Sequence, residues 1–171
     1  MILGGLLLAV AGWAFTFALS WGNFWIKIGV TVILVSLYSL SRQRPPLSFG
    51  VRDAALGVLA AALLYGIFYL GFVLSPFVVP DAVRQVGDIY DRGAGTSTTV
   101  VALLLLFVTG PGEEVFWRGF LQENLMARYG GGTGFVMTTL LYGAVHVFSL
   151  NFMLVMAAFV AGAFWGGLYL W

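Results

Sequence analysis

Charged residues are scarce in this chain of 171 residues. Lysine, arginine, aspartate and glutamate together make up 9% of it, whereas an ordinary soluble domain contains about 25%. Hydrophobic residues make up 61%, and eight basic and seven acidic side chains leave a net charge of +1. The chain therefore offers no basic surface for nucleic acid, and its composition indicates a polytopic membrane protein.

Cysteine is absent, which excludes a disulfide framework, a thiol nucleophile and a thiolate metal site. Histidine occurs once, at His146, so a His-Glu-x-x-His metal motif is excluded as well. No basic segment precedes the first apolar run, and we interpret that run as a retained membrane span rather than a cleaved signal.

Apolar runs long enough to cross about 30 Å of hydrocarbon recur along the chain. They predict an all-α polytopic helical bundle of about six transmembrane helices, in a single domain that spans residues 1–171. The expected spans are residues 2–19, 24–40, 54–74, 98–128, 133–148 and 151–171. We interpret the long polar stretch at residues 80–98 as a solvated connector, in preference to a short interfacial helix at residues 81–87.

The loop at residues 41–52 is polar and basic, with arginines at Arg42, Arg44 and Arg52. Its Pro45-Pro46 pair cannot continue a helix. By the positive-inside rule, this loop and the N-terminus are expected on the cytoplasmic side. We expect the protein to lie in the cell (inner) membrane.

Two adjacent carboxylates and an arginine interrupt the fourth apolar span, at Glu113, Glu114 and Arg118. A charge at the centre of a membrane helix costs about 2.5–3.5 kcal/mol on insertion scales, so this set indicates a functional site. Glu114 and Arg118 have the spacing and order of a favourable helical ion pair. Glu113 points about 100° away from Glu114 and is left to act as a general base. The alternative is a purely structural Glu-Arg clamp between two helices.

The acidic pair follows Gly110-Pro111-Gly112 directly. Because proline removes a helical hydrogen bond and kinks the axis, we expect the helix to break here and a fresh half-helix to begin. Free backbone N–H groups at its start would then favour the two carboxylates. Broken helices at membrane depth line protein or water cavities, so the sequence predicts a wet internal pocket.

His146 lies in the fifth span, one helical turn after Tyr142 and on the same face. A lone histidine in a membrane helix serves as an interhelical polar contact about as often as it serves a function. Gly143 and Ala144 between them would allow close helix approach. We interpret Asn151 as a helix cap or interfacial residue rather than a site residue.

Together, Glu113-Glu114-x-x-x-Arg118 and Tyr142-x-x-x-His146 resemble the two motifs of the CAAX-protease and bacteriocin-processing family of glutamic intramembrane proteases, also called the abortive-infection or Rce1-like family. The second motif usually begins with phenylalanine, whose place Tyr142 takes here. The resemblance covers residues 98–171, the expected core of the chain. It implies a helical membrane fold whose motifs converge on a cavity open to water and substrate.

The resemblance further implies that Glu113 activates water and that His146 holds or polarises it, while Glu114, Arg118 and Tyr142 shape the site. It implies no cofactor. The expected partners are membrane lipids and a protein or peptide substrate that is lipid-modified or membrane-anchored. Family members usually carry a further histidine, followed four residues later by asparagine. No histidine follows His146, so the chain shown either stops before that helix or belongs to a short or degenerate branch.

The leading hypothesis is an intramembrane endopeptidase that hydrolyses a peptide bond of a membrane-associated protein or peptide tail with a glutamate-activated water. A divalent metal held by Glu113, Glu114 and His146 is a weaker enzyme hypothesis. A non-catalytic membrane protein that binds a peptide in the same cavity, such as an immunity or scaffold protein, is the hypothesis from a different class. Proton-coupled transport is weaker still.

Overall fold

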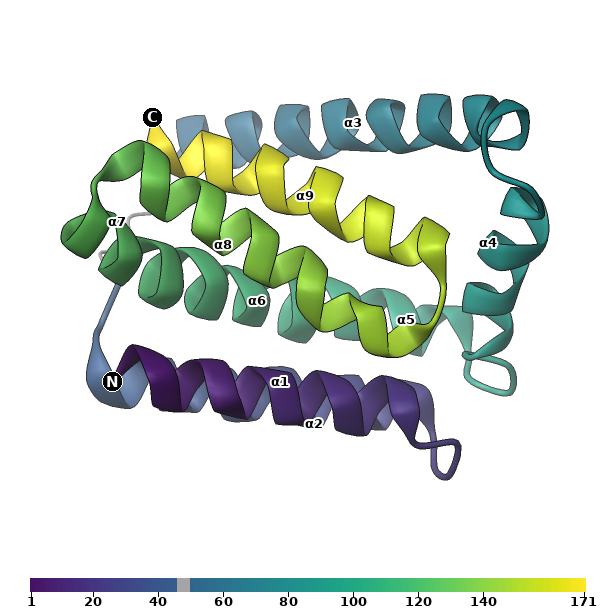
Figure 1. Ribbon diagram of the computed structural model, residues 1–171, viewed down its shortest axis with the longest axis horizontal. Coiled ribbons are helices and arrows are strands. Elements are labelled where there is room, and N and C mark those ends of the chain that lie inside the picture. The colour runs from purple at the N-terminus through teal and green to yellow at the C-terminus, as the bar shows by residue number, and fades with distance from the viewer. Residues whose placement is uncertain (46–49) are drawn as a thin grey trace.

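The computed structural model describes residues 1–45 and 50–171. Every regular element within these residues is a helix, and long apolar helices run beside one another (Figure 1). The expected all-α polytopic bundle is confirmed. Pro46, the second member of the expected Pro-Pro turn, lies outside the described residues.

The first two helices, α1 (Ile2–Ala18) and α2 (Phe24–Arg42), form an antiparallel pair joined by a short turn (Figure 1). The Asn23 side chain starts α2 by accepting hydrogen bonds from the backbone N–H groups of Trp25 and Ile26, at 2.8 and 3.2 Å. The helices approach closely at Gly12, where a Cβ atom would lie 2.4 Å from the Thr31 side chain. The small residue therefore sets how tightly this pair packs.

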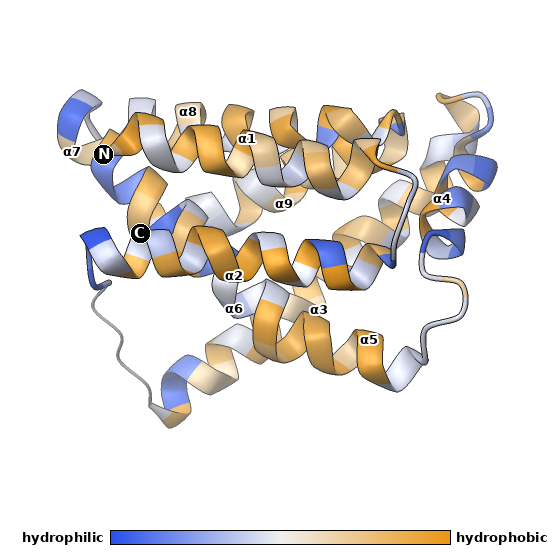
Figure 2. Cartoon of the chain, turned by 90° about the horizontal axis from the view of Figure 1, so that it is seen from below, coloured by the Kyte–Doolittle hydropathy of each residue, from blue (hydrophilic) through white to orange (hydrophobic). Residues whose placement is uncertain are grey.

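The next helix, α3 (Val51–Leu74), is exposed along most of its length, with Ala60 and Leu64 as its buried residues. It leads through η1 (Ser75–Phe77) into α4 (Ala82–Asp91). The outward faces of the long helices are hydrophobic, whereas hydrophilic residues gather on α4 and at the opposite end of the bundle (Figure 2). This distribution matches a bilayer around the long helices.

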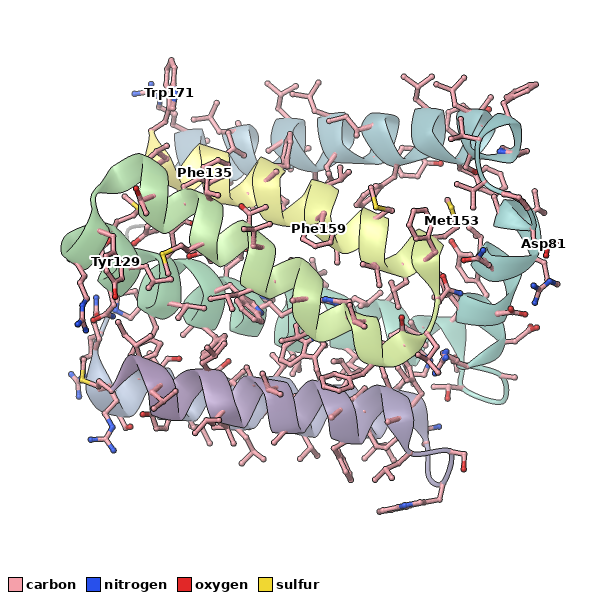
Figure 3. The ribbon with its side chains drawn as sticks, in the orientation of Figure 1. Asp81, Tyr129, Phe135, Met153, Phe159 and Trp171 are labelled. Atoms are coloured by element: carbon pink, nitrogen blue, oxygen red, sulfur yellow. The ribbon has the colours of Figure 1, made fainter. Side chains whose placement is uncertain are left out.

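The expectation of a solvated connector at residues 80–98 is wrong for α4, which is helical. Arg84 forms ion pairs with Asp81 at 3.2 Å and Asp88 at 3.4 Å, at the spacings that support a helix. The side chain of Asp81 points away from the bundle (Figure 3). On the inner side, the Asn151 amide donates to the Gln85 carbonyl at 2.7 Å. These two sets of contacts explain why α4 folds and docks against the start of the last helix.

The helix that carries the acidic pair runs without a break from Thr98 to Tyr129, over 32 residues. It consists of α5 (Thr98–Leu104), η2 (Leu105–Thr109), α6 (Gly110–Phe116), η3 (Trp117–Gln122) and α7 (Glu123–Tyr129). Both η2 and η3 are π-helical, a wider winding with hydrogen bonds between residues five apart.

The expected interruption at Gly110-Pro111-Gly112 therefore takes the form of a π-helical turn, and the predicted fresh half-helix does not form. The Gly110 N–H donates to the Leu105 carbonyl, five residues earlier. This shifted register accommodates Pro111 because such bulges absorb irregularities without ending a helix. Gly112 instead permits close packing on α2, since a Cβ atom there would lie 2.4 Å from Val32.

The last two long helices are α8 (Gly131–Val145), extended by η4 (His146–Ser149), and α9 (Phe152–Leu170). Phe159 of α9 packs directly on Gly143 of α8 (Figure 3). A Cβ atom built on Gly143 would lie 2.3 Å from the Phe159 ring. Asn151 caps α9 by accepting from the Leu154 N–H at 3.0 Å, as predicted.

Among the described residues, four helices are long and apolar enough to cross a membrane. They are Phe24–Arg42, Val51–Phe77, Thr98–Tyr129 and Phe152–Leu170. The remaining two expected spans correspond to α1, an apolar helix of 17 residues, and to α8, of 15 residues before η4 extends it. The chain is thus an integral membrane protein with the predicted order of helices.

An aromatic core joins the α1–α2 pair to the helix that carries the acidic residues. Its central side chains are at most 1% exposed and include Trp13, Phe116, Trp117 and Phe120. Fully burying one large apolar side chain stabilises a fold by about 1.5–3 kcal/mol. The same cluster borders the candidate site, because the Trp117 ring packs against that of Tyr142, with centroids 5.1 Å apart.

Candidate active site

Glu113 and Tyr142 bring the two sequence motifs into direct contact. The Tyr142 hydroxyl on α8 donates a hydrogen bond to Oε2 of Glu113 on α6, at 2.6 Å. Glu113 is half-buried, and the described residues provide no recorded partner for its other oxygen, Oε1. A hydroxyl that holds one oxygen of a carboxylate fixes the direction of the other. The arrangement leaves Oε1 as the acceptor that a small molecule could use.

Glu114 pairs with Arg118, as the spacing predicted. Oε1 of Glu114 lies 3.1 Å from Nη1 of Arg118. The two partners differ in exposure, because the Arg118 side chain is 3% exposed and that of Glu114 is 42% exposed. Arg118 therefore carries a buried charge, and its partner Glu114 is partly exposed at the surface.

Arg118 also ties its own helix to α9. Its Nη2 lies 3.3 Å from the carbonyl oxygens of both Ala161 and Gly162, and it donates to each. Its guanidinium stands over the Tyr142 ring, with the Cζ atom 5.1 Å from the ring centroid. The structural clamp considered from the sequence is thus present, and it is built around the same arginine that pairs with Glu114.

His146 is buried, and both of its ring nitrogens have protein partners. Nδ1 lies 2.8 Å from the Tyr142 carbonyl oxygen, one helical turn earlier. Nε2 lies 3.3 Å from Nε1 of Trp13, on α1. The rings of Tyr142 and His146 are adjacent, with centroids 5.1 Å apart. His146 thus lies behind Tyr142, and no contact between His146 and Glu113 is recorded.

Sequence reasoning missed the aromatic residues that surround this histidine. Trp13 lies 5.6 Å from Trp117 and 6.0 Å from His146, centroid to centroid. Trp117 in turn lies 5.1 Å from Tyr142. One signal was available: Trp13 lies inside an apolar span, away from the interfacial belt, where its N–H needs a partner. Nothing local in the sequence identifies that partner as a residue 133 positions away.

Two cavities in the described part of the chain lie away from the acidic pair, where the sequence predicts a wet pocket. One, of about 330 Å³, lies beside the α1–α2 turn and includes Lys27 and Arg92. The other, of about 340 Å³, is an apolar groove over Gly12 and its neighbours on α1 and α2. Access to the acidic pair comes instead through the exposed part of Glu114.

The side chains do not form the metal site that was considered from the sequence. Within the described residues, no group of three or more His, Asp or Glu side chains lies close enough to share an ion. His146 contributes no free nitrogen to such a group, because both of its nitrogens already have partners.

The fold and the site together define a polytopic helical membrane protein with a Glu–Tyr pair and a Glu–Arg pair where three helices meet. Residues 95–171 match the family model described as type II CAAX prenyl endopeptidase Rce1-like. This match agrees with the resemblance seen in the motifs. The matched family is one of protease-type enzymes. Searches of curated proteins and of solved structures found no significant match.

Proposed function

We propose that the protein is an intramembrane endopeptidase that hydrolyses a peptide bond of a membrane-associated protein or peptide tail, using a water activated by Glu113. The observation that carries this proposal is the different engagement of the two adjacent carboxylates. Glu114 forms an ion pair with Arg118 at 3.1 Å. Tyr142 holds one carboxylate oxygen of Glu113 by a hydrogen bond, and the other oxygen of Glu113 remains available. A positioned carboxylate with a free oxygen is the group that general-base hydrolysis requires.

In the proposed reaction, Oε1 of Glu113 takes a proton from a bound water. The water oxygen adds to the carbonyl carbon of the scissile peptide bond, and the carbonyl oxygen becomes negatively charged. When the carbon–nitrogen bond breaks, the proton held by Glu113 passes to the leaving nitrogen. Glu113 returns to its starting carboxylate form, and the products are a carboxylic acid, which keeps the second proton of the water, and an amine.

Arg118 supports this chemistry from behind the reacting groups. With 3% of its side chain exposed and three oxygen partners, it is too enclosed to reach substrate. It holds Glu114 and stands against the Tyr142 ring, so it fixes both neighbours of the proposed base. We assign Glu114, Arg118 and Tyr142 to shaping the site.

The role proposed for His146 is to hold or polarise the water. In this structure its Nε2 accepts from the Trp13 indole, and its ring lies next to that of Tyr142. His146 would then act from beside Tyr142.

The proposal extends to the surroundings of the protein. We place it in the cell membrane, with the N-terminus and residues 41–52 in the cytoplasm, because the loop arginines follow the positive-inside rule. Its partners are then membrane lipids and a lipid-modified or membrane-anchored protein or peptide substrate. Substrates of this kind diffuse in the same plane as the site.

The proposal is tested by mass spectrometry of protein termini in cells that express wild type, Glu113→Gln or His146→Ala at equal membrane levels. Glu123→Gln is the matched control, since Glu123 also accepts from a tyrosine, Tyr169 at 3.0 Å, but lies outside the site. We expect processed termini with wild type and Glu123→Gln, and none with Glu113→Gln. Identical termini in all four strains would refute the proteolytic function.

A non-catalytic peptide-binding protein is the second candidate. It is favoured by the engagement of both His146 nitrogens with the protein itself, an arrangement that needs no water. In that case Glu113→Gln would leave the cellular function intact as long as the protein folds. Survival of the phenotype in Glu113→Gln, with unchanged termini, would select this candidate.

A further inference from the structure

Trp13 lies outside the matched segment and forms a hydrogen bond with a motif side chain. It lies on α1, its side chain is fully buried, and its Nε1 is 3.3 Å from Nε2 of His146. The family match begins at residue 95 and therefore gives no role to this residue.

The two contacts of His146 determine which of its nitrogens carries hydrogen. The Tyr142 carbonyl oxygen can only accept, so Nδ1 of His146, at 2.8 Å, must be the donor. An indole N–H can only donate, so Nε2 of His146 must be the acceptor. Both requirements are met by a single state, the neutral imidazole with hydrogen on Nδ1.

The indole is held in place by the aromatic core. Its ring packs edge-on against Trp117, with centroids 5.6 Å apart, and Trp117 packs in the same way against Tyr142 at 5.1 Å. Both tryptophans are fully buried. Trp13 therefore cannot turn away from the histidine without disturbing the cluster that supports Tyr142.

We infer that Trp13 is a positioning residue for His146, which fixes the imidazole ring and keeps the unprotonated Nε2 directed toward the indole. Without the donor, Nδ1 keeps its bond to the Tyr142 carbonyl oxygen, but Nε2 loses its partner and the ring loses one of its two restraints. The consequence for catalysis rests on the proposed function, but the contact and its effect on the histidine do not.

The first experiment uses the full chain in lipid nanodiscs, labelled with ¹⁵N-histidine. The single histidine gives one pair of ring nitrogen signals, so only Nδ1 and Nε2 of that ring have to be told apart. Wild type is expected to show a protonated Nδ1 and an unprotonated, hydrogen-bonded Nε2. In Trp13→Phe the Nε2 signal is expected to move toward the position of a free acceptor nitrogen. A second variant with 3-benzothienylalanine at position 13 keeps the indole shape without the N–H, in case the phenylalanine loosens the core.

Trp117→Phe is the matched control. Trp117 is an equally buried tryptophan of the same cluster, but its Nε1 has no hydrogen-bond partner in the described residues. This variant is expected to leave the histidine signals unchanged. Unchanged signals in both position-13 variants, or an equal shift in Trp117→Phe, would overturn the inference.

The second measurement is peptidase kinetics on the substrate found from the termini. Trp13→Phe is expected to lower kcat about fivefold, the change that loss of one ordinary buried hydrogen bond produces, and to leave KM unchanged. A shifted signal with unchanged kcat would refute the positioning role. If wild type itself cleaves nothing, the proposed function fails, and the histidine signals alone decide whether Trp13 fixes the imidazole.

Discussion

Glu113 and Glu114 are adjacent in the sequence, but the structure predicts opposite consequences when each is changed to glutamine. Glu114→Gln removes the carboxylate from Arg118, whose side chain is 3% exposed. Removing one partner of a buried ion pair costs about 3–5 kcal/mol, because the other charge is left uncompensated. Because the Glu114 side chain is 42% exposed, water screens part of this attraction, and we expect a reduced loss of about 1–3 kcal/mol.

Glu113→Gln is expected to leave stability nearly unchanged. The Tyr142 hydroxyl keeps an acceptor in the glutamine oxygen, and the bond weakens because that oxygen carries no charge. At the same time, the site no longer contains a half-buried carboxylate whose other oxygen is unpaired. The first change lowers the free energy of unfolding and the second raises it, so the two offset each other. Activity, in contrast, should disappear, because an amide cannot take a proton from water.

The assay is thermal unfolding of both variants in the same detergent, run beside the analysis of protein termini. We expect Glu114→Gln to unfold several degrees below wild type with part of its activity intact, and Glu113→Gln to unfold at the wild-type temperature without activity. The reasoning fails if the two stabilities are equally reduced, or if Glu114→Gln abolishes cleavage at full stability. Either result would mean that the carboxylates share one role.

Three further predictions concern single groups. Tyr142→Phe should lower kcat by about tenfold at most, because water can replace its hydroxyl at a half-buried carboxylate. Tyr169→Phe is the control. A complete loss of cleavage in Tyr142→Phe would show that the Tyr142 hydroxyl itself reacts. Gly143→Ala should destabilise the protein by about 1–3 kcal/mol in thermal unfolding, since its Cβ atom would lie 2.3 Å from Phe159. Gly57→Ala, with nothing within 4 Å of its Cβ position, should be neutral, and equal effects of the two would contradict this packing. Chelators should leave cleavage unchanged. If a chelator abolishes cleavage and added Zn²⁺ restores it, the metal hypothesis is correct instead.

Features set by local sequence were predicted well. The apolar run at residues 2–19 became α1, Ile2–Ala18, because span length is fixed by the thickness of the bilayer. The Glu114–Arg118 pair followed from helical spacing, and the Asn151 cap from the preference of asparagine for a helix start. In each case the deciding contact lies within four residues of its partner or depends on composition alone.

Features set by distant contacts were not predicted. Gly110-Pro111-Gly112 looks like a helix break in isolation, but close packing of Gly112 on α2 and a π-helical turn keep the helix continuous. Helix α4 looked like a connector, because its support from Asn151 comes from a residue 66 positions away. The role of Trp13 was invisible for the same reason.

These distant contacts show that the candidate site is not contained in the segment that defines the family. All five motif residues lie within residues 95–171, but two of their supports come from earlier helices. Trp13 on α1 occupies Nε2 of His146, and Ser36 on α2 donates to the Gly112 carbonyl at 3.0 Å, directly before the acidic pair. The first two helices therefore set the position of the proposed base from one side and of the histidine from the other. A related chain could keep both motifs and still differ in activity if its first two helices packed differently.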